Sequence, residues 1–567
     1  LRELWQAQVA QHTGLTGQEL MDGAVDVQWF HRAYGTLGAE RWGEVYRAAL
    51  YASGGLGHKR AQLFADAMLS QIPREAIFSR VKDKRQGDAV RSLGLLPLPH
   101  DGRAEEIQAR YAVIQAFLRT SRQFGSQRQA SEKLAATIGL ENLARTAGYP
   151  DPLRLQWAME ARAASDLAAG QGVVTVGEVR VALQFNGDGE ADLLVAKAGK
   201  PLKAIPAAVK KDPAVKALSE RKAEIKRQAV RMRRALEQAM CRGDSFTGEE
   251  LRELSAHPVL AGQLSGLVLI GERKTGYLTR AAQSLRRHDG VAVPLGVDEA
   301  VRIAHPHDLL NRGEWHLWQS ECVRAGRSQP FKQIFRELYL LTEAECADGV
   351  VSRRYAGHQV QSRQGQALLG TRGWVTHFEE GTSRTFHEQN LTAWLGIANG
   401  MWTPAEVEGP TVEGVWFTRR GDRRPLPLEQ VPPLVFSETM RDLDLLVSVA
   451  HMGGVDPEAT ASTAEMRAAL VRETCAMLKL ENVRIQNRHV LVEGQLGSYS
   501  IHLGSGIVHR QPGGALCIVP VHAQHRGRLF LPFVDNDPQT AEVLSKVLLL
   551  ARDREIKDPV ILQQILA

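Results

Sequence analysis

The first 170 residues carry apolar side chains at helical spacing. Residues 38–54, 104–125 and 131–148 repeat apolar positions every three or four residues, and each segment ends in glycine. This periodicity predicts amphipathic helices, and glycine often follows the end of a helix. Short breaks between successive helices are typical of a bundle or an irregular, repeat-like solenoid. We therefore expect a helical domain over residues 1–170, of a kind that commonly serves packing or partner binding.

From Gly172 the pattern changes to an alternation of apolar and polar residues. Residues 172–185 (GVVTVGEVRVALQF) alternate at period two, and the turn-forming residues NGDGE follow them. Such alternation predicts strands with one buried face. A β-hairpin or a small sheet is expected here.

A long helix is predicted after the sheet. Asp212 before Pro213 is a favourable helix start, because aspartate caps free amides and proline suits the first helical position. One face of this helix is apolar and consists of Leu218, Ile225, Ala229, Met232, Leu236 and Met240. Thr247 and Glu250 then form the pattern of a capping box for a short helix. Residues 266–272 and 275–280 are expected to be strands.

A further helix is predicted from Pro330. Its apolar stripe, which we expect in the core, consists of Phe331, Ile334, Phe335, Leu338 and Leu341. Lys332 and Arg336 lie one turn apart and are candidates for holding a phosphate or a carboxylate. The favoured alternative is that Arg336 pairs with a neighbouring acid.

Residues 352–369 form an unusually polar segment of helical length. If the segment is helical, Arg354, His358 and Gln361 share a face, with Tyr355 beside them. Such a group can bind an anion or a nucleotide and can transfer a proton near neutral pH. His358 and Tyr355 are therefore candidate catalytic residues, and Arg354, Gln361 and Arg372 are candidate ligand-binding residues. Internal packing is the alternative, and it is the commoner role of a single histidine on a helix.

Strands are expected again after Asn390, over residues 390–400 and 411–420 and into the segment that begins at Pro432. This last segment contains a cluster of charged residues, which we call the charged knot: Glu438, Arg441, Asp442 and Asp444. Paired carboxylates can perform acid–base or metal chemistry. Because Arg441 stands between them, an internal salt-bridge network is the more economical interpretation.

The last hundred residues alternate helical and strand patterns. Helices are predicted over 463–480 and from Pro538, with strands between them over 482–494, 498–510, 515–523 and 528–534. The histidines of this part include His502, His509, His522 and His525. Their spacing fixes no acid or cysteine partner, so we predict no metal site. No motif of the chain specifies a cofactor.

These patterns together predict a multidomain α+β protein. Its expected domains are a helical N-terminal domain (1–170), a central mixed α+β domain with the long basic helix and a polar cleft (171–453), and a small C-terminal α+β domain (454–567). A chain of 567 residues is too long for a single core, which favours several domains.

The composition is that of an ordinary globular protein, with 44% hydrophobic and 24% charged residues. No apolar run approaches the roughly 18 residues needed to cross a bilayer, and no secretion signal precedes the first helix. The five cysteines are scattered and never spaced as CxxC. A cytoplasmic protein without a disulfide framework is therefore expected. The lack of an initial methionine suggests a piece of a longer chain.

The net charge of +6 is concentrated in one segment. Residues 207–242 hold 11 Lys and Arg against 4 Asp and Glu, a local +7, so the remainder sums to about −1. Within the long helix, Lys226, Arg227, Arg231 and Arg234 form a candidate surface for nucleic acid or for an acidic partner. The alternative is a solvated face partly paired with Glu220 and Glu224. Nucleic acid is the less favoured of the two, because the helix has no aromatic residues on which bases could stack.

A series of motifs occurs here in one order: IPAAVKKD, the arginine-rich helix, HPVL, AHPHDLL, QPFKQIFRELYLLTEAE, RYAGHQV and RGW. Together they resemble a bacterial family of unknown function that carries the description molybdate metabolism regulator-like. The resemblance extends over about residues 120–567. Members of that family often contain a WGR domain, and the sequence shows none, so a nucleic-acid role lent by that domain does not transfer. The resemblance supplies no reaction, and no residues form a recognisable molybdate site.

Three functions follow as hypotheses. The first is a regulatory or binding module of a larger bacterial cytoplasmic protein, which holds a protein partner or the rest of a longer chain. The second is an enzyme that acts on a nucleotide or another anionic substrate in the central polar cleft. The third is nucleic-acid binding through the basic helix.

Overall fold

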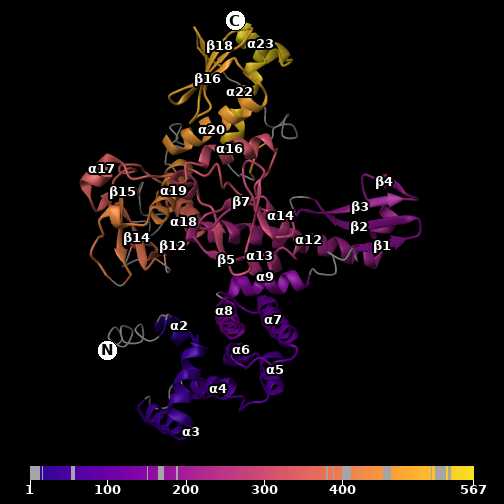
Figure 1. The fold of residues 1–567 in the computed structure, drawn as a ribbon, viewed down its shortest axis with the longest axis vertical. Coiled ribbons are helices and arrows are strands. Elements are labelled where there is room, and N and C mark those ends of the chain that lie inside the picture. Colours follow the sequence, from indigo (N-terminus) through magenta and orange to yellow (C-terminus); the bar gives the residue numbers. More distant parts are fainter. Residues whose placement is uncertain are drawn as a thin grey trace. The chain divides into compact units, whose positions relative to one another are not determined.

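The computed structural model of the chain describes residues 13, 15, 17–52, 58–149, 151–163, 172–186, 189–377, 381–386, 389–398, 410–420, 422–450, 461–512, 514–516, 531–533 and 538–566. Contacts within the chain separate two compact units, Leu1–Ala169 (unit 1) and Gly170–Ala567 (unit 2). Figure 1 labels their elements.

Every regular element that the structure describes in unit 1 is helical, which confirms the helical N-terminal region. The elements are α2 (Gly17–Asp22), α3 (Val27–Ala52), α4 (His58–Met68), α5 (Arg74–Lys82), α6 (Gly87–Leu93), α7 (Arg103–Thr120), η1 (Ser121–Gln123), α8 (Ser126–Ala147) and α9 (Pro152–Ala163). Their apolar faces meet in one core that includes Ile77, Val90, Ile114 and Leu143.

Helices α6 and α8 approach each other closely through glycine. A Cβ atom on Gly139 of α8 would lie 2.8 Å from the carbonyl oxygen of Val90, which belongs to the backbone of α6 and has no freedom to move away. The space between the two backbones therefore excludes any larger side chain.

We expect Gly139→Ala to destabilise unit 1 by about 1–3 kcal/mol, because the added methyl group forces the two helices apart. The matched control is Gly43→Ala in α3, where an added Cβ meets nothing within 4 Å. This control should be neutral or slightly stabilising, since alanine restricts the unfolded chain. Calorimetric unfolding of both variants in the full chain provides the comparison. Equal effects of the two substitutions would contradict the close approach.

The described residues of unit 2 form four antiparallel sheets. The first has the order β1 (Val173–Val176), β2 (Val179–Phe185), β3 (Ala191–Lys197), β4 (Lys200–Leu202), and the second β5 (Ser245–Thr247), β10 (Ala300–Ile303), β6 (Val268–Ile270), β7 (Thr275–Leu278), β8 (Ser284–Arg286), β9 (Ala292–Pro294). The third has the order β11 (Val351–Ser352), β15 (Thr411–Arg419), β14 (Leu391–Ala398), β13 (Gly381–Phe386), β12 (Trp374–His377), and the fourth β16 (Val483–Gln486), β17 (His489–Glu493), β18 (Ser498–His502), β19 (Val508–Gln511), β20 (Ala515–Leu516). The unit is thus mixed α+β, as predicted.

Helices surround these sheets. They are α11 (Ala207–Lys210), α12 (Pro213–Arg242), α13 (Gly248–Leu254), α14 (Pro258–Ser265), α15 (Pro306–Asn311), α16 (Trp315–Arg324), α17 (Glu343–Asp348), α18 (Ser362–Gly370), η2 (Leu428–Gln430), α19 (Pro433–Ala450), α20 (Ala461–Met477), α22 (Pro538–Ala551), η3 (Asp553–Glu555) and α23 (Pro559–Leu566). One apolar cluster contains Tyr277 and Trp318 together with Tyr499 and Val547 of the C-terminal part. The described helices include none that combines the length and the apolar character needed to cross a membrane.

The long basic helix is present as predicted. In α12, the Asp212 side chain accepts hydrogen bonds from the amides of Ala214 and Val215, and Pro213 occupies the first turn. The predicted apolar positions Leu218, Ile225, Met232, Leu236 and Met240 are all buried. An amphipathic pattern and a strong cap were therefore sufficient to locate this helix.

The helix predicted from Pro330 is wrong. Residues 331–335 form bends and turns, and residues 336–341 have no regular secondary structure. Of the apolar stripe, Phe331, Ile334, Phe335 and Leu338 are buried as expected, and Leu341 is half-buried. The reason is the buried side chain of Gln333, which bonds to both backbone groups of Val268 and to the carbonyl of Ala304. These bonds hold the segment against two strands of the second sheet, so it is buried on every side and no helical period decides its shape.

The predicted helix over residues 352–369 is correct only from Ser362 onward. Gly357 has a φ of 87°, a left-handed conformation that ends any helix before it. The amides of Gly357 and Val360 bond to the carbonyls of Val412 and Pro410. Residues 357–360 therefore pair with the chain at the start of β15 instead of forming a helix.

The segment from Pro432 is also corrected. We expected strands there, but Pro433–Ala450 is a helix, α19. Its buried residues recur at helical spacing and include Val435, Met440, Leu443 and Val447. The apolar residues of this segment recur about every four positions, as they do in a helix. The carboxylates between them made this spacing hard to recognise in the sequence.

Two helices of unit 2 begin with a buried histidine followed by proline. Nδ1 of His257 accepts the amide of Val259 at 3.1 Å, and Nδ1 of His305 accepts the amide of His307 at 3.2 Å. A ring nitrogen that accepts carries no proton, so each neutral ring holds its proton on Nε2. In His305 this proton faces Glu438, whereas Nε2 of His257 has no partner among the described residues.

Burial lowers the pKa of His257 to about 4. The unfolded chain, whose histidine titrates near pH 6.5, therefore binds more protons than the folded chain as the pH falls, and stability decreases over this window. Between pH 7 and pH 5.5 we expect His257 to account for a loss of about 1 kcal/mol. His257→Asn keeps a capping side chain but cannot titrate. Denaturation at both pH values should show a smaller loss for this variant, and an equal loss would contradict the assignment.

Candidate functional site

Unit 2 contains a cluster of buried charged side chains around Arg336. The guanidinium of Arg336 forms two hydrogen bonds of 2.7 Å to the carboxylate of Glu438 on α19. Its third nitrogen donates to Glu237 on α12 at 2.7 Å. Nε2 of His305 lies 3.1 Å from Oε1 of Glu438, the oxygen that also accepts from Nε of Arg336. One arginine thus joins α12, α19 and the segment that precedes α17.

The remaining residues of the charged knot point into the same interior but to different partners. Arg441 donates to Glu337, which also pairs with Lys332. Asp442 accepts from Trp374 and Arg384, and Arg372 lies 3.4 Å from it. Asp444 accepts from Tyr339. The four knot residues therefore do not pair with one another, and each connects α19 to another element.

Burial alone would raise the pKa of Glu438, but Arg336 outweighs it and holds this pKa well below its usual range. Burial also raises the pKa of the Cys241 thiol, which donates to Glu438 at 3.1 Å. A protonated, 7% exposed thiol is a poor nucleophile. The arrangement is suited to holding elements together.

Substitution of Arg336 tests whether these buried charges hold the elements of unit 2 together. Arg336→Met should destabilise unit 2 by roughly 3–5 kcal/mol, because it leaves Glu438 buried without its partner. Arg227→Met is the control, since Arg227 is 63% exposed and its salt bridge within the described part of the chain is to Glu224, and it should change stability by less than about 0.5 kcal/mol. Adding Glu438→Gln to Arg336→Met should recover part of the loss. Thermal unfolding of the full chain measures all three, and a mild effect of Arg336→Met would contradict the structural role.

The residues predicted for a polar cleft have separate partners. Arg354 pairs with Glu345 at 2.5 Å, whereas Arg372 lies beside Asp442. Tyr355 is 3% exposed, and burial raises the pKa of its hydroxyl. His358 is half-buried, and its Nδ1 lies 3.1 Å from the carbonyl oxygen of Tyr355. Gln361 precedes the first residue of α18. The two arginines are thus neutralised by different carboxylates.

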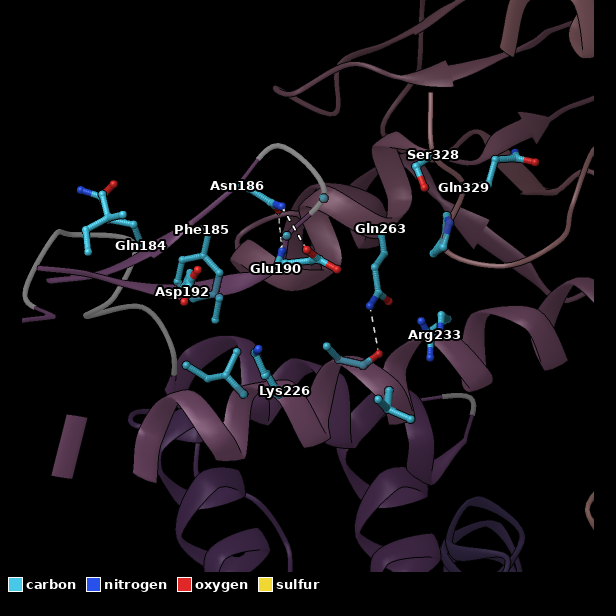
Figure 2. A pocket seen from close by; sticks show the side chains of 18 residues that line it. Gln184, Phe185, Asn186, Glu190, Asp192, Lys226, Arg233, Gln263, Ser328 and Gln329 are labelled. Carbon is cyan, nitrogen blue, oxygen red and sulfur yellow. Dashed lines mark hydrogen bonds between the residues drawn. The ribbon is translucent and has the colours of Figure 1, made fainter. Parts of the chain in front are cut away.

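The main cavity described in unit 2 lies elsewhere, beside α12 (Figure 2). It has a volume of about 710 Å³, within the range of small-ligand sites. We call it the α12 cavity. Its lining comes from the β2–β3 hairpin (Gln184, Phe185, Asn186, Gly189, Glu190, Ala191, Asp192, Leu194), from α12 (Ile225, Lys226, Ala229, Val230, Arg233), from α14 (Gly262, Gln263) and from Ser328, Gln329 and Pro330.

Two cations on α12, Lys226 and Arg233, line this cavity. Lys226 and Arg233 form no salt bridge or side-chain hydrogen bond in the part of the chain that the structure describes. Of the acids opposite them, Asp192 pairs with Lys222 at 2.5 Å, and its pKa is lowered mainly by Lys222 and to a smaller extent by Lys226. Glu190 accepts from the neutral amide of Asn186 at 3.2 Å and keeps its negative charge. Figure 2 shows Lys226 and Arg233 on the helix and Asp192 and Glu190 on the facing hairpin. The wall formed by α12 therefore carries two cations that form no direct ion pair among the described residues, and the facing hairpin carries two carboxylates.

Gln263 adds an unsatisfied acceptor. Its Nε2 donates to the carbonyl of Ala229 at 2.9 Å, which fixes the orientation of the amide because only the nitrogen can donate. Its Oε1 has no hydrogen-bond partner among the described residues. This oxygen is also buried, in a residue that is only 7% exposed. A buried acceptor without a donor is costly, so this oxygen favours a ligand that supplies an N–H or O–H group.

The hairpin is held at a fixed distance from α14 by a second glycine. Gly189 has a φ of 76°, and a Cβ atom there would lie 2.7 Å from the carbonyl oxygen of Val259. Only glycine satisfies both conditions. The hairpin wall of the α12 cavity is therefore fixed on the first turn of α14.

The predicted nucleic-acid surface is divided by the structure. Arg227 and Arg231 both contact Glu224, at 2.7 and 3.5 Å. Lys226 faces the α12 cavity, and Arg234 is exposed. Lys226 is therefore the member of this predicted nucleic-acid surface that lines the cavity. It was predicted to contact nucleic acid, not to line a cavity. Arg233, the other cation of the cavity, was not among these candidates.

The sequence missed the hairpin wall and Gln263. Both lie far from α12 along the chain, and no local pattern marks them as neighbours. The available signal was the concentration of positive charge in α12, which exceeds what nearby acids can neutralise.

No metal site emerges from the described residues, where no three His, Cys, Asp or Glu side chains are placed to hold an ion. His502 bonds to Ser505 and stacks near His489, with ring centroids 4.9 Å apart. His509 lies on β19. His522 and His525 lie outside the described residues.

Three segments of the chain match families to which no function is assigned. Residues 2–159 match a family of unknown function (DUF5724), residues 199–374 match a domain of unknown function (DUF4132), and residues 464–565 match another domain of unknown function (DUF7737). None of these descriptions mentions molybdate or a WGR domain. No curated protein and no solved structure matches the chain. Most of the α12 cavity, including α12 and α14, lies within the second matched segment.

Proposed function

We propose that unit 2 is a regulatory or binding module and that the α12 cavity holds an anionic ligand. The observation that carries this proposal is the pair of cations, Lys226 and Arg233, which line the cavity and form no ion pair within 4 Å among the described residues. Apolar side chains line the same space, among them Phe185, Leu194 and Val230. Pockets with this combination bind molecules that have charged groups on an apolar body.

The enzyme hypothesis has weaker support. A general acid or base must lie within hydrogen-bond reach of the group it serves. Tyr355 is buried, and the arginines expected beside it pair with Glu345 and Asp442. If unit 2 is an enzyme of this type, His358→Ala should abolish turnover and leave folding intact. The binding hypothesis expects that substitution to leave ligand binding in the α12 cavity unchanged.

The role as a bacterial cytoplasmic regulator follows from the family resemblance and forms part of the proposal. For the same reason, molybdate belongs among the anions to be tested. The cavity offers no ligand set specific to molybdate, so we expect it to bind no better than other oxyanions of similar charge.

The test is a thermal-shift series on the full chain with phosphate, molybdate, glutarate and poly-glutamate. A ligand at about 100 times its dissociation constant stabilises the protein by roughly 2.7 kcal/mol. We expect at least one dicarboxylate or polycarboxylate to raise the unfolding temperature. The Lys226→Gln and Arg233→Gln double variant should lose this response.

The control is Lys216→Gln, because Lys216 is an exposed cation on the same helix and lies outside the cavity. This variant should respond like the parent protein. A stabilisation that the double variant retains, or that is absent for all four anions, would contradict the proposed function.

A further inference from the structure

We infer that the ligand of the α12 cavity is a short acidic peptide segment of a protein partner, with two carboxylates flanking an apolar side chain. This inference rests on the proposed function and specifies the ligand class. It combines three features of the cavity: the spacing of its cations, its exposed apolar residues and the unsatisfied oxygen of Gln263.

The first feature is the spacing of the two cations. Lys226 and Arg233 are seven residues apart on α12. Seven residues make nearly two turns, so both side chains lie on one face of the helix, about 10.5 Å apart along its axis. In a polyproline II segment, residues i and i+3 also share a face, about 9 Å apart. An acidic residue at each of these two positions would match the cations, and the long lysine and arginine side chains can cover the remaining difference.

The second feature is the apolar surface between the cations. Val230 of α12 is 49% exposed, and Leu194 of the facing strand is 54% exposed. Both line the cavity, with Phe185 beside them. Exposed aliphatic residues on both walls of one cavity favour an apolar group between them. Phosphate, molybdate and other inorganic oxyanions supply no such group.

The third feature is the acceptor of Gln263. Its buried Oε1 needs a hydrogen-bond donor, whereas a fully ionised dicarboxylate or oxyanion has only acceptors. A peptide has carboxylates on its side chains and N–H groups on its backbone. It therefore satisfies Gln263 and the two cations at the same time, which neither a simple anion nor an apolar ligand can do.

Nucleic acid fits these features less well. Its phosphates would satisfy the cations, but its backbone provides no aliphatic group for Leu194 and Val230. Stacking of bases is the usual source of apolar contact with single strands, and among the described lining residues Phe185 is the one aromatic side chain, so at most one base could stack. A protein partner is therefore the favoured occupant.

The experiment measures fluorescence polarisation of a labelled peptide, acetyl-Glu-Leu-Val-Glu-amide, with the full chain. Two matched peptides serve as controls: one has glutamine in place of both glutamates, and the other is N-methylated at the leucine and valine amides. We expect each control peptide to bind at least tenfold more weakly. The Lys226→Gln and Arg233→Gln double variant should weaken the acidic peptide at least tenfold, and Lys216→Gln should not.

Leu194→Ser tests the apolar contact separately. It replaces an exposed side chain, so the fold should tolerate it, and we expect it to weaken the acidic peptide several-fold. The same substitution should leave glutarate binding unchanged, because glutarate is too small to span the cations and cover Leu194 together.

The outcomes separate the two proposals. If glutarate or phosphate binds through Lys226 and Arg233 but the acidic peptide binds no better than its controls, the peptide inference is wrong and the anion-binding function stands. If a single-stranded oligonucleotide binds with steep salt dependence and displaces the peptide, the occupant is nucleic acid and the inference is again wrong. If no probe depends on Lys226 and Arg233, both proposals fail.

Discussion

The structure of unit 2 depends on the bidentate contact between Arg336 and Glu438. Both side chains are almost fully buried, so neither charge is solvated by water, and each is stabilised by the other. The same guanidinium reaches Glu237 on α12, which connects the helix beside the cavity to α19. Buried ion pairs add little net stability compared with apolar packing, but they require a defined arrangement of the two charged side chains. Their contribution here is to specify how three segments meet.

The elements that could be predicted are those in which one local signal dominates. The start and apolar face of α12 were recognisable from Asp212, Pro213 and the spacing of Leu218 and Ile225. The alternation over residues 172–185 likewise located the first sheet. The helix predicted from Pro330 failed because its polar residues are buried as well. Gln333 bonds to Val268 of β6, which lies 65 positions earlier in the chain, and no local pattern contains that information.

The residues of the candidate site also fall into those that the sequence indicates and those that it does not. Charge density along the chain identified α12 as a surface of interest, because an excess of cations is visible without a fold. The opposite wall, with Leu194, and the acceptor on Gln263 become neighbours of α12 only through tertiary packing. The polar segment that contains His358 shows the reverse case. Its residue types suggest chemistry, but Gly357 bends the backbone so that Arg354 and Arg372 meet different carboxylates.

Arg233 and Glu237 lie one turn apart on a single uninterrupted helix. The residue that faces the cavity is therefore held in place by the residue that anchors α12 to Arg336. The hairpin that forms the opposite wall is also fixed, because Gly189 lies close to Val259. A ligand that enters does not need to order either wall, so little conformational entropy is lost on the protein side. Differences in affinity among related ligands should then appear mainly as differences in residence time, with similar association rates.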